Sequence, residues 1–223
     1  MYKFSPSLMC MDLTRFKEQI LFLNTVADYF HIDIMDGHFV PNITLSPFFI
    51  SELKKLSAKP IDSHLMVQNP QEIMNACINA GSDFISLHPE TIGAKAFRLI
   101  DELKKRNIKV GLVFNPEVSV QHAEYYLEFA DKITVMTVDP GFAGQPFIAQ
   151  MLKKIENIRE IREKNGYGYA VEIDGSCNRR TFADLVKAGG EIFVVGTSGL
   201  FGLDPDIKTA WEKMLFLFNE AVL

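Results

Sequence analysis

Two histidines and two aspartates fall within eight positions of the segment HIDIMDGHFVPN, residues 31–42. The segment continues an apolar run with the composition of a buried strand, where such residues are rare unless they are paired or bind a metal ion. Alternate side chains of a strand share a face, so His31, Asp33 and Met35 point the same way. These residue types are compatible with a metal site, an acid–base site, a turn, or a combination of them.

Further polar residues end other apolar runs of the chain. Ser7 ends YKFSPS, His64 and His88 end two later runs, and Asp174 ends YAVEID. One inward histidine is more often a hydrogen-bonded core residue than a ligand, but several polar groups at equivalent strand ends indicate a common purpose. Four of these side chains could converge at one end of the sheet: His31, Asp33, His64 and Asp174. Two imidazoles and two carboxylates are suitable ligands for Zn²⁺, Fe²⁺, Mn²⁺ or Co²⁺.

Neighbouring polar residues have simpler interpretations. Asp36-Gly37 has the composition of a tight turn, and we expect His38 and His122 to be surface or structural residues. By parity, Asp62 shares a face with His64, and Glu172 shares one with Asp174.

Three glycine-rich segments suggest a phosphate site. DPGFAGQPF, DGSCN and VGTSGLF follow the sixth, seventh and eighth apolar runs. Glycine lets the backbone approach an anion closely, and consecutive N–H groups can surround it. GTSGL could open a short helix whose first amides face the anion. Each turn is weak evidence alone, and three on successive late loops are stronger.

The elements that must position these residues alternate regularly. Eight apolar runs are each followed by a segment of helical periodicity. Asn69-Pro70 and Asp204-Pro205 predict helix starts, and Gly81 and Gly189 predict helix ends. This pattern predicts a single (β/α)8 TIM barrel over residues 1–223, with the site at the carboxyl ends of the strands. A doubly wound open sheet is the second choice, but the turn after the first run has no GxGxxG pattern.

Composition excludes several classes of function. The 223 residues carry a formal charge of −5 without a basic cluster, which argues against a nucleic-acid partner. We find no secretion signal and no apolar stretch long enough for a membrane span. Three scattered cysteines indicate a reducing compartment. A cytoplasmic protein is therefore expected.

The motifs SPS, HIDIMDGHFVPN, DSHLMV, HPE, MTVDPGFAGQ and EIDGS resemble, in order and spacing, the ribulose-phosphate 3-epimerase family of ribulose-phosphate-binding barrels. The resemblance covers essentially the whole chain. The pentulose enzymes usually have GFGGQ, DGG and GSA where this chain has GFAGQ, DGSC and GTSG. These variants, with LSPFF and HPET, resemble the D-allulose-6-phosphate 3-epimerase branch.

The resemblance implies roles for individual residues. It implies one divalent ion per subunit (Zn, Fe, Co or Mn rather than Mg), a small sugar phosphate as substrate, and a homo-oligomer between dimer and hexamer. His31, Asp33, His64 and Asp174 match the metal ligands, and Asp33 and Asp174 match the acid–base pair. The residues that match substrate contacts are Ser7, His64, Met35, Met66, Met136, Gly141, Phe142, Ala143, Gly144, Gly175, Ser176, Gly196, Thr197 and Ser198.

The implied reaction converts D-allulose 6-phosphate to D-fructose 6-phosphate through a metal-stabilised 2,3-enediolate, with one aspartate on each face. The alternative is D-ribulose 5-phosphate, with D-xylulose 5-phosphate as product. A sister class of barrel decarboxylases and aldolases carries a DxKxxD cluster, whereas this chain has His64 where that lysine would stand. A metal-dependent phosphatase and a non-catalytic sugar-phosphate-binding protein are more remote alternatives.

Overall fold

The computed structural model describes residues 2–222, in which eight strands alternate with helices. The strands are β1 (Lys3–Pro6), β2 (Phe30–Met35), β3 (Ile61–Met66), β4 (Phe84–Leu87), β5 (Lys109–Phe114), β6 (Lys132–Met136), β7 (Ala170–Asp174) and β8 (Ile192–Val195). The α-helices are α1 (Phe16–Val26), α2 (Pro47–Lys54), α3 (Pro70–Ala80), α4 (Pro89–Ile92), α5 (Ala96–Lys105), α6 (Met151–Asn165), α7 (Phe182–Ala188) and α8 (Ile207–Val222). A 3₁₀ segment, Val120–Phe129, takes the helix position between β5 and β6.

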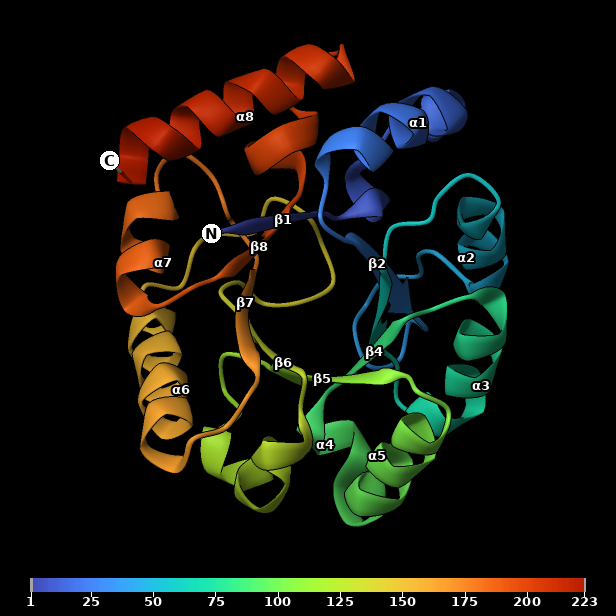
Figure 1. The fold of residues 1–223 in the computed structure, drawn as a ribbon, viewed down its shortest axis with the longest axis vertical. Helices are drawn as coiled ribbons and strands as arrows, with labels where there is room; N and C mark the ends of the chain where they lie inside the picture. Colours follow the sequence, from blue (N-terminus) through green and yellow to red (C-terminus); the bar gives the residue numbers. More distant parts are fainter. Residues whose placement is uncertain (1, 223) are drawn as a thin grey trace.

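The strands form one parallel sheet curled into a barrel, and the helices surround it (Figure 1). Hydrogen-bonded neighbours follow the order β1-β8-β7-β6-β5-β4-β3-β2. In the described part of the chain the ring closes between β1 and β2 through one bridge, which pairs Ser7 with His31. The predicted (β/α)8 barrel and its eight strands are confirmed.

Strand alternation separates the barrel interior from the helical layer. Ile32 and Ile34 of β2 belong to the main apolar core, together with apolar side chains of the helices. Phe218 of α8 packs edge to face against Phe4 of β1 and Phe193 of β8. The opposite set of side chains faces inward, and much of it is polar.

Helix ends follow local chemistry. Gly81 and Gly189 end α3 and α7 with φ of +115° and +116°, a region that favours glycine. The predicted start at Asp204-Pro205 was wrong, because α8 begins at Ile207. There the Asp206 carboxylate accepts the N–H of Thr209 at 2.8 Å, as an N-terminal cap does. Within residues 2–222 no helix combines the length and apolarity that a membrane crossing requires.

Candidate active site

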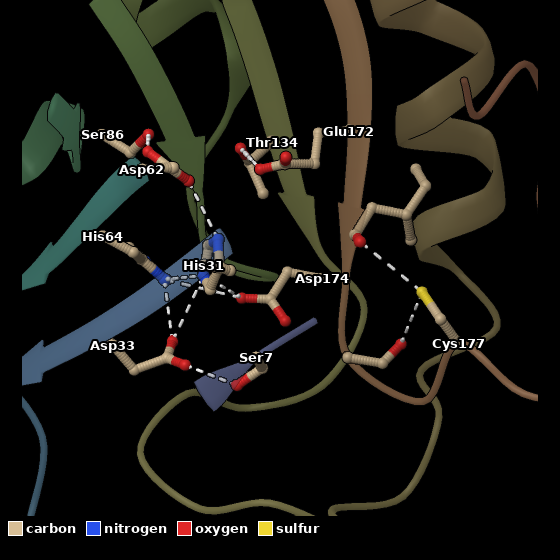
Figure 2. A network of polar contacts seen from close by, with 12 residues as sticks. Ser7, His31, Asp33, Asp62, His64, Ser86, Thr134, Glu172, Asp174 and Cys177 are labelled. Atoms are coloured by element: carbon tan, nitrogen blue, oxygen red, sulfur yellow. Dashed lines mark hydrogen bonds and ion pairs between the residues drawn. The ribbon is translucent and has the colours of Figure 1, made fainter. Parts of the chain in front are cut away.

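Four side chains from three strands meet in the carboxyl half of the barrel (Figure 2). His31 and Asp33 lie on β2, His64 on β3 and Asp174 on β7. His31 Nε2 lies 3.2 Å from His64 Nδ1. The same nitrogen lies 3.3 Å from Asp33 Oδ1 and 3.5 Å from Asp174 Oδ2. His64 Nδ1 lies 3.3 and 3.5 Å from those two oxygens. The fold thus brings together the four residues predicted as metal ligands.

The spacing of these four atoms fits a tetrahedral ion. Zinc bonds to nitrogen and carboxylate oxygen measure about 2.0–2.2 Å, and the edge of a tetrahedron is about 1.6 times its centre-to-corner distance. Ligand atoms should therefore lie roughly 3.3–3.6 Å apart. Four of the five distances, 3.3–3.5 Å, lie within this range, and the fifth, between the two imidazole nitrogens, is 3.2 Å. Two imidazoles and two carboxylates also suit a divalent transition metal by type.

The electrostatics of the cluster favour a bound cation. Burial lowers the pKa of His31, but the charge of Asp33 and the hydrogen bond of Asp174 raise it well above 6.5. Burial raises the pKa of Asp33 and Asp174, and the adjacent imidazoles lower it below 3.8. An imidazole nitrogen binds either a proton or a metal ion, so an ion entering this cluster displaces protons.

The two aspartates differ in their surroundings. Ser7 Oγ donates to Asp33 Oδ2 at 2.7 Å, which leaves Oδ1 to face the imidazoles. Asp174 presents Oδ2 to the imidazoles, and its side chain is 14% exposed against 5% for Asp33. Asp33 is therefore fixed by the protein, and Asp174 is the more accessible carboxylate.

His64 contacts a third buried histidine, His88, for which no individual role was predicted. His64 Nε2 lies 2.8 Å from His88 Nε2. Burial lowers the pKa of His88 to about 4, so its imidazole is neutral at pH 7 and can accept the N–H of His64. Glu90 Oε1 lies 3.6 Å from His88 Nδ1 and accepts the Asn115 amide at 2.8 Å. The position of His88 at the end of the β4 run was the signal available in the sequence.

A cavity opens beside the cluster, and both aspartates line it. Its walls include methionines from three strands, and Met35 and Met66 also pack against each other. The lining adds Met9, Cys10 and Gln145, which the sequence did not single out. His64 is fully buried and is not part of the lining. All other residues predicted to contact substrate line this cavity: Ser7, Met35, Met66, Met136, Gly141, Phe142, Ala143, Gly144, Gly175, Ser176, Gly196, Thr197 and Ser198.

The late loops converge on this cavity, and several of their residues have positive φ. Gly175 has φ of +110°, and a Cβ there would lie 2.6 Å from Val138 Cγ2. Ser176 also has a positive φ, +49°, which is uncommon for a residue with a side chain. Its hydroxyl donates to the Gln145 carbonyl at 2.8 Å and so joins the loop after β7 to the loop after β6. Residues 197–201 form a short π-helical turn, where an extra helix was expected.

The rest of the 31–42 segment braces the loops. The Asp36 carboxylate accepts the backbone N–H groups of His38, Phe39 and Gln68 at 2.8–2.9 Å, which joins the loops after β2 and β3. His38 is exposed, as expected. The Asn42 amide donates to the Gly141 carbonyl at 2.7 Å. This segment thus joins the loop after β2 to the loop after β3 and to the loop after β6, and Gly141 of the latter lines the cavity.

A parallel barrel whose inward polar residues gather beside glycine-rich late loops is typical of barrel enzymes that act on phosphorylated small molecules. Comparison with known sequences narrows this class of enzymes to the isomerases that act on carbohydrate phosphates. The chain belongs to the ribulose-phosphate 3-epimerase family, whose model matches residues 3–201.

Individual relatives agree with the family. The chain is 36% identical over 219 residues to a ribulose-phosphate 3-epimerase of Aquifex aeolicus (strain VF5), covering 98% of this chain and 97% of the relative. It is 34% identical over 215 residues to that of Escherichia coli (strain K12), covering 96% and 94%. The predicted family is confirmed, whereas these matches do not distinguish its hexulose branch.

Solved structures support the fold. A 3-hexulose-6-phosphate synthase matches with a TM-score of 0.69 at 16% identity, covering 99% of this chain and 100% of the other. The synthase of Salmonella typhimurium matches with a TM-score of 0.67 at 15% identity, covering 98% and 99%. At these identities the likeness concerns the barrel alone.

Proposed function

We propose that this chain is a divalent-metal-dependent 3-epimerase that converts D-allulose 6-phosphate to D-fructose 6-phosphate. One observation carries the proposal: Asp33 of β2 and Asp174 of β7 both contact the His31 imidazole and both line the cavity. Carboxylates that served only to bind a metal ion would not need to line the cavity as well. Two carboxylates that also reach the cavity can exchange protons with a molecule bound there.

The reaction requires two proton transfers on opposite faces of one carbon. Asp33 and Asp174 are the pair that removes the C3 proton and returns another, and their roles exchange with the direction of the reaction. Ser7 holds the second oxygen of Asp33 and so fixes the orientation of that carboxylate. A divalent ion held by the four ligand side chains would supply positive charge next to the substrate's O2 and O3. Methionine side chains give the cavity an apolar wall that limits access of water.

The phosphate group is proposed to bind among the late loops. Their cavity-lining backbone includes three residues with positive φ from consecutive loops, namely Gly144, Gly175 and Ser176. Thr197 and Ser198 add hydroxyl donors from the loop after β8. Backbone amides in such turns bind anions without a full positive charge.

The proton-transfer proposal is tested by solvent exchange. In deuterated water, native protein with substrate should exchange the C3 hydrogen, which a mere sugar-phosphate-binding protein would not do. Asp33→Asn and Asp174→Asn should each slow exchange by about 10²–10⁴-fold while thermal unfolding remains cooperative. Asp184→Asn, an exposed position on α7, is the control. Near-native exchange in either site variant would overturn the two-carboxylate mechanism.

The choice of substrate is tested separately. GFAGQ, DGSC and GTSG support the six-carbon ketose, whereas the names of the relatives favour D-ribulose 5-phosphate. The two differ by one hydroxymethylene group, and pocket contacts of this size typically change kcat/KM by about 10–200-fold. We expect the higher kcat/KM for D-allulose 6-phosphate. A higher value for D-ribulose 5-phosphate would establish the alternative.

A further inference from the structure

A buried lysine lies inside the barrel behind the site. Lys132 opens β6, and its side chain is 3% exposed. Its ammonium lies 2.5 Å from Asp62 Oδ2 of β3 and also contacts Glu172 of β7. Ser86 donates to Asp62 Oδ1 at 2.6 Å, and Thr134 donates to Glu172 Oε1 at 2.8 Å. A lysine and the two carboxylates that it contacts are thus enclosed within the barrel.

The barrel makes room for this network. A Cβ at Gly111 of β5 would lie 2.1 Å from Ser86 Oγ. The hydroxyl that bonds Asp62 therefore occupies the space that any other residue at position 111 would fill. A buried charge without a partner is costly, so the carboxylates supplied by β3 and β7 are what make Lys132 tolerable here.

The network continues to a proposed metal ligand. Asp62 Oδ2, the oxygen nearest Lys132, lies 2.9 Å from Nδ1 of His31 (Figure 2). The other ring nitrogen, Nε2, faces Asp33 and Asp174. A carboxylate at one nitrogen of a histidine fixes the ring orientation and leaves the other nitrogen to bind metal.

The lysine also fills a place where a cation could bind. His31, Asp62 and Glu172 offer a nitrogen and two carboxylate oxygens within 4.8 Å of one another. The ammonium of Lys132 contacts both carboxylates, so this place is taken by a charge attached to β6. A cation fixed to the chain cannot be exchanged for an ion from solution.

We propose that Lys132 is a positioning residue for the metal site. It holds Asp62 against Nδ1 of His31, which aims Nε2 at the ion. This inference rests on the metal site of the proposed function.

The test keeps the buried charge balanced. Lys132→Met alone would leave two unpaired carboxylates, so it is made together with Glu172→Gln, which gives the trio its native net charge. The comparison is Glu172→Gln alone, which retains Lys132 and Asp62. Val135→Ala in the Glu172→Gln background is the control for general loss of stability, because Val135 of β6 packs in the main core outside this network.

The readouts are the Kd for Co²⁺, measured by competition with a chelating dye, the number of ions per chain, and the Co²⁺ absorption spectrum. Glu172→Gln and its Val135→Ala partner should bind one ion with near-native affinity. Lys132→Met/Glu172→Gln should bind about 10–100-fold more weakly, with an altered spectrum. Adding Asp62→Asn to this double variant should change Kd little, because Lys132 acts through Asp62.

Two results would overturn the inference. One is a double variant that binds Co²⁺ as tightly as Glu172→Gln with an unchanged spectrum. If that variant does not fold, NMR of the native protein with ¹⁵N-labelled lysine decides. A slowly exchanging Lys132 ammonium signal that moves on addition of Zn²⁺ supports the inference, and an absent or unmoved signal contradicts it. Failure of the metal site itself is recognised separately, because His64→Asn would then keep native Co²⁺ affinity.

Discussion

Replacing Ser7 with alanine removes the hydroxyl that donates to Asp33 and leaves every proposed metal ligand in place. The lost bond is the 2.7 Å contact from Ser7 Oγ to Asp33 Oδ2, between side chains of residues that are 5% and 4% exposed. Asp33 then keeps its contacts with the imidazoles but loses the donor that fixes its second oxygen. We predict slower C3 proton exchange, with the ion still bound.

The size of the effect follows from the chemistry of this bond. A hydrogen bond to a charged group contributes about 1.5–3 kcal/mol, and each 1.36 kcal/mol corresponds to about tenfold in rate. Because Asp33 is enclosed, water has little access to replace the hydroxyl. We therefore expect kcat/KM to fall by about 10–100-fold.

Ser5→Ala is the matched control for this prediction. Ser5 lies two residues earlier on β1 and is fully buried, and its hydroxyl has no hydrogen-bond partner among residues 2–222. Its loss should leave activity unchanged and should not lower the free energy of unfolding. Both variants are compared by C3 exchange in deuterated water, Co²⁺ titration and chemical denaturation. If Ser7→Ala exchanged within twofold of Ser5→Ala, the positioning of Asp33 by Ser7 would be refuted.

Three further predictions concern the metal ion, the Asp36 carboxylate that joins two loops, and Gly175. Chelation should abolish C3 exchange, and Co²⁺, Zn²⁺ or Mn²⁺ should restore it in native protein but poorly in His64→Asn; exchange that survives chelation contradicts the metal site. Asp36→Ala should lower the free energy of unfolding by about 1–2 kcal/mol, because three backbone N–H groups lose their acceptor. Burial raises the pKa of Asp36, but those three N–H groups lower it below 3.8. The loss of unfolding free energy in Asp36→Ala should therefore be complete above pH 3.8 and should vanish as the pH falls through the pKa of Asp36 in the folded protein. An equal loss in acid would refute this explanation. Gly175→Ala should destabilise by about 1–3 kcal/mol, since φ is +110° and Val138 blocks the Cβ; adding Val138→Ala should recover part of it, and no recovery would mean that the clash is not the cause.

Much of the architecture could be predicted because strand and helix periods are local signals. All eight apolar runs became strands, and the parity that placed His31 and Asp33 on one face holds within β2. Helix starts were less predictable. Asp204-Pro205 has the right composition, but Asp206 is the residue whose carboxylate caps the helix.

The parts of the site that escaped prediction depend on contacts across the barrel. Parity indicates that Asp62 and Glu172 face inward, but the register and curvature of the sheet decide that Lys132 of β6 meets both. The same holds for His88, whose role depends on its contact with His64. No spacing within one segment encodes such contacts.

The closure of the barrel has a consequence for how the protein inactivates. β1 and β2 meet at the bridge between Ser7 and His31, whereas the other neighbours share longer ladders. Local unfolding should therefore begin at this seam between β1 and β2, because few backbone hydrogen bonds join the two strands there. Any parting of the seam also separates Ser7 from Asp33. On heating, activity should therefore be lost before global unfolding. At those temperatures the amides of β1 and β2 near Ser7 and His31 should exchange with solvent, while the amides of the other strands remain protected from exchange.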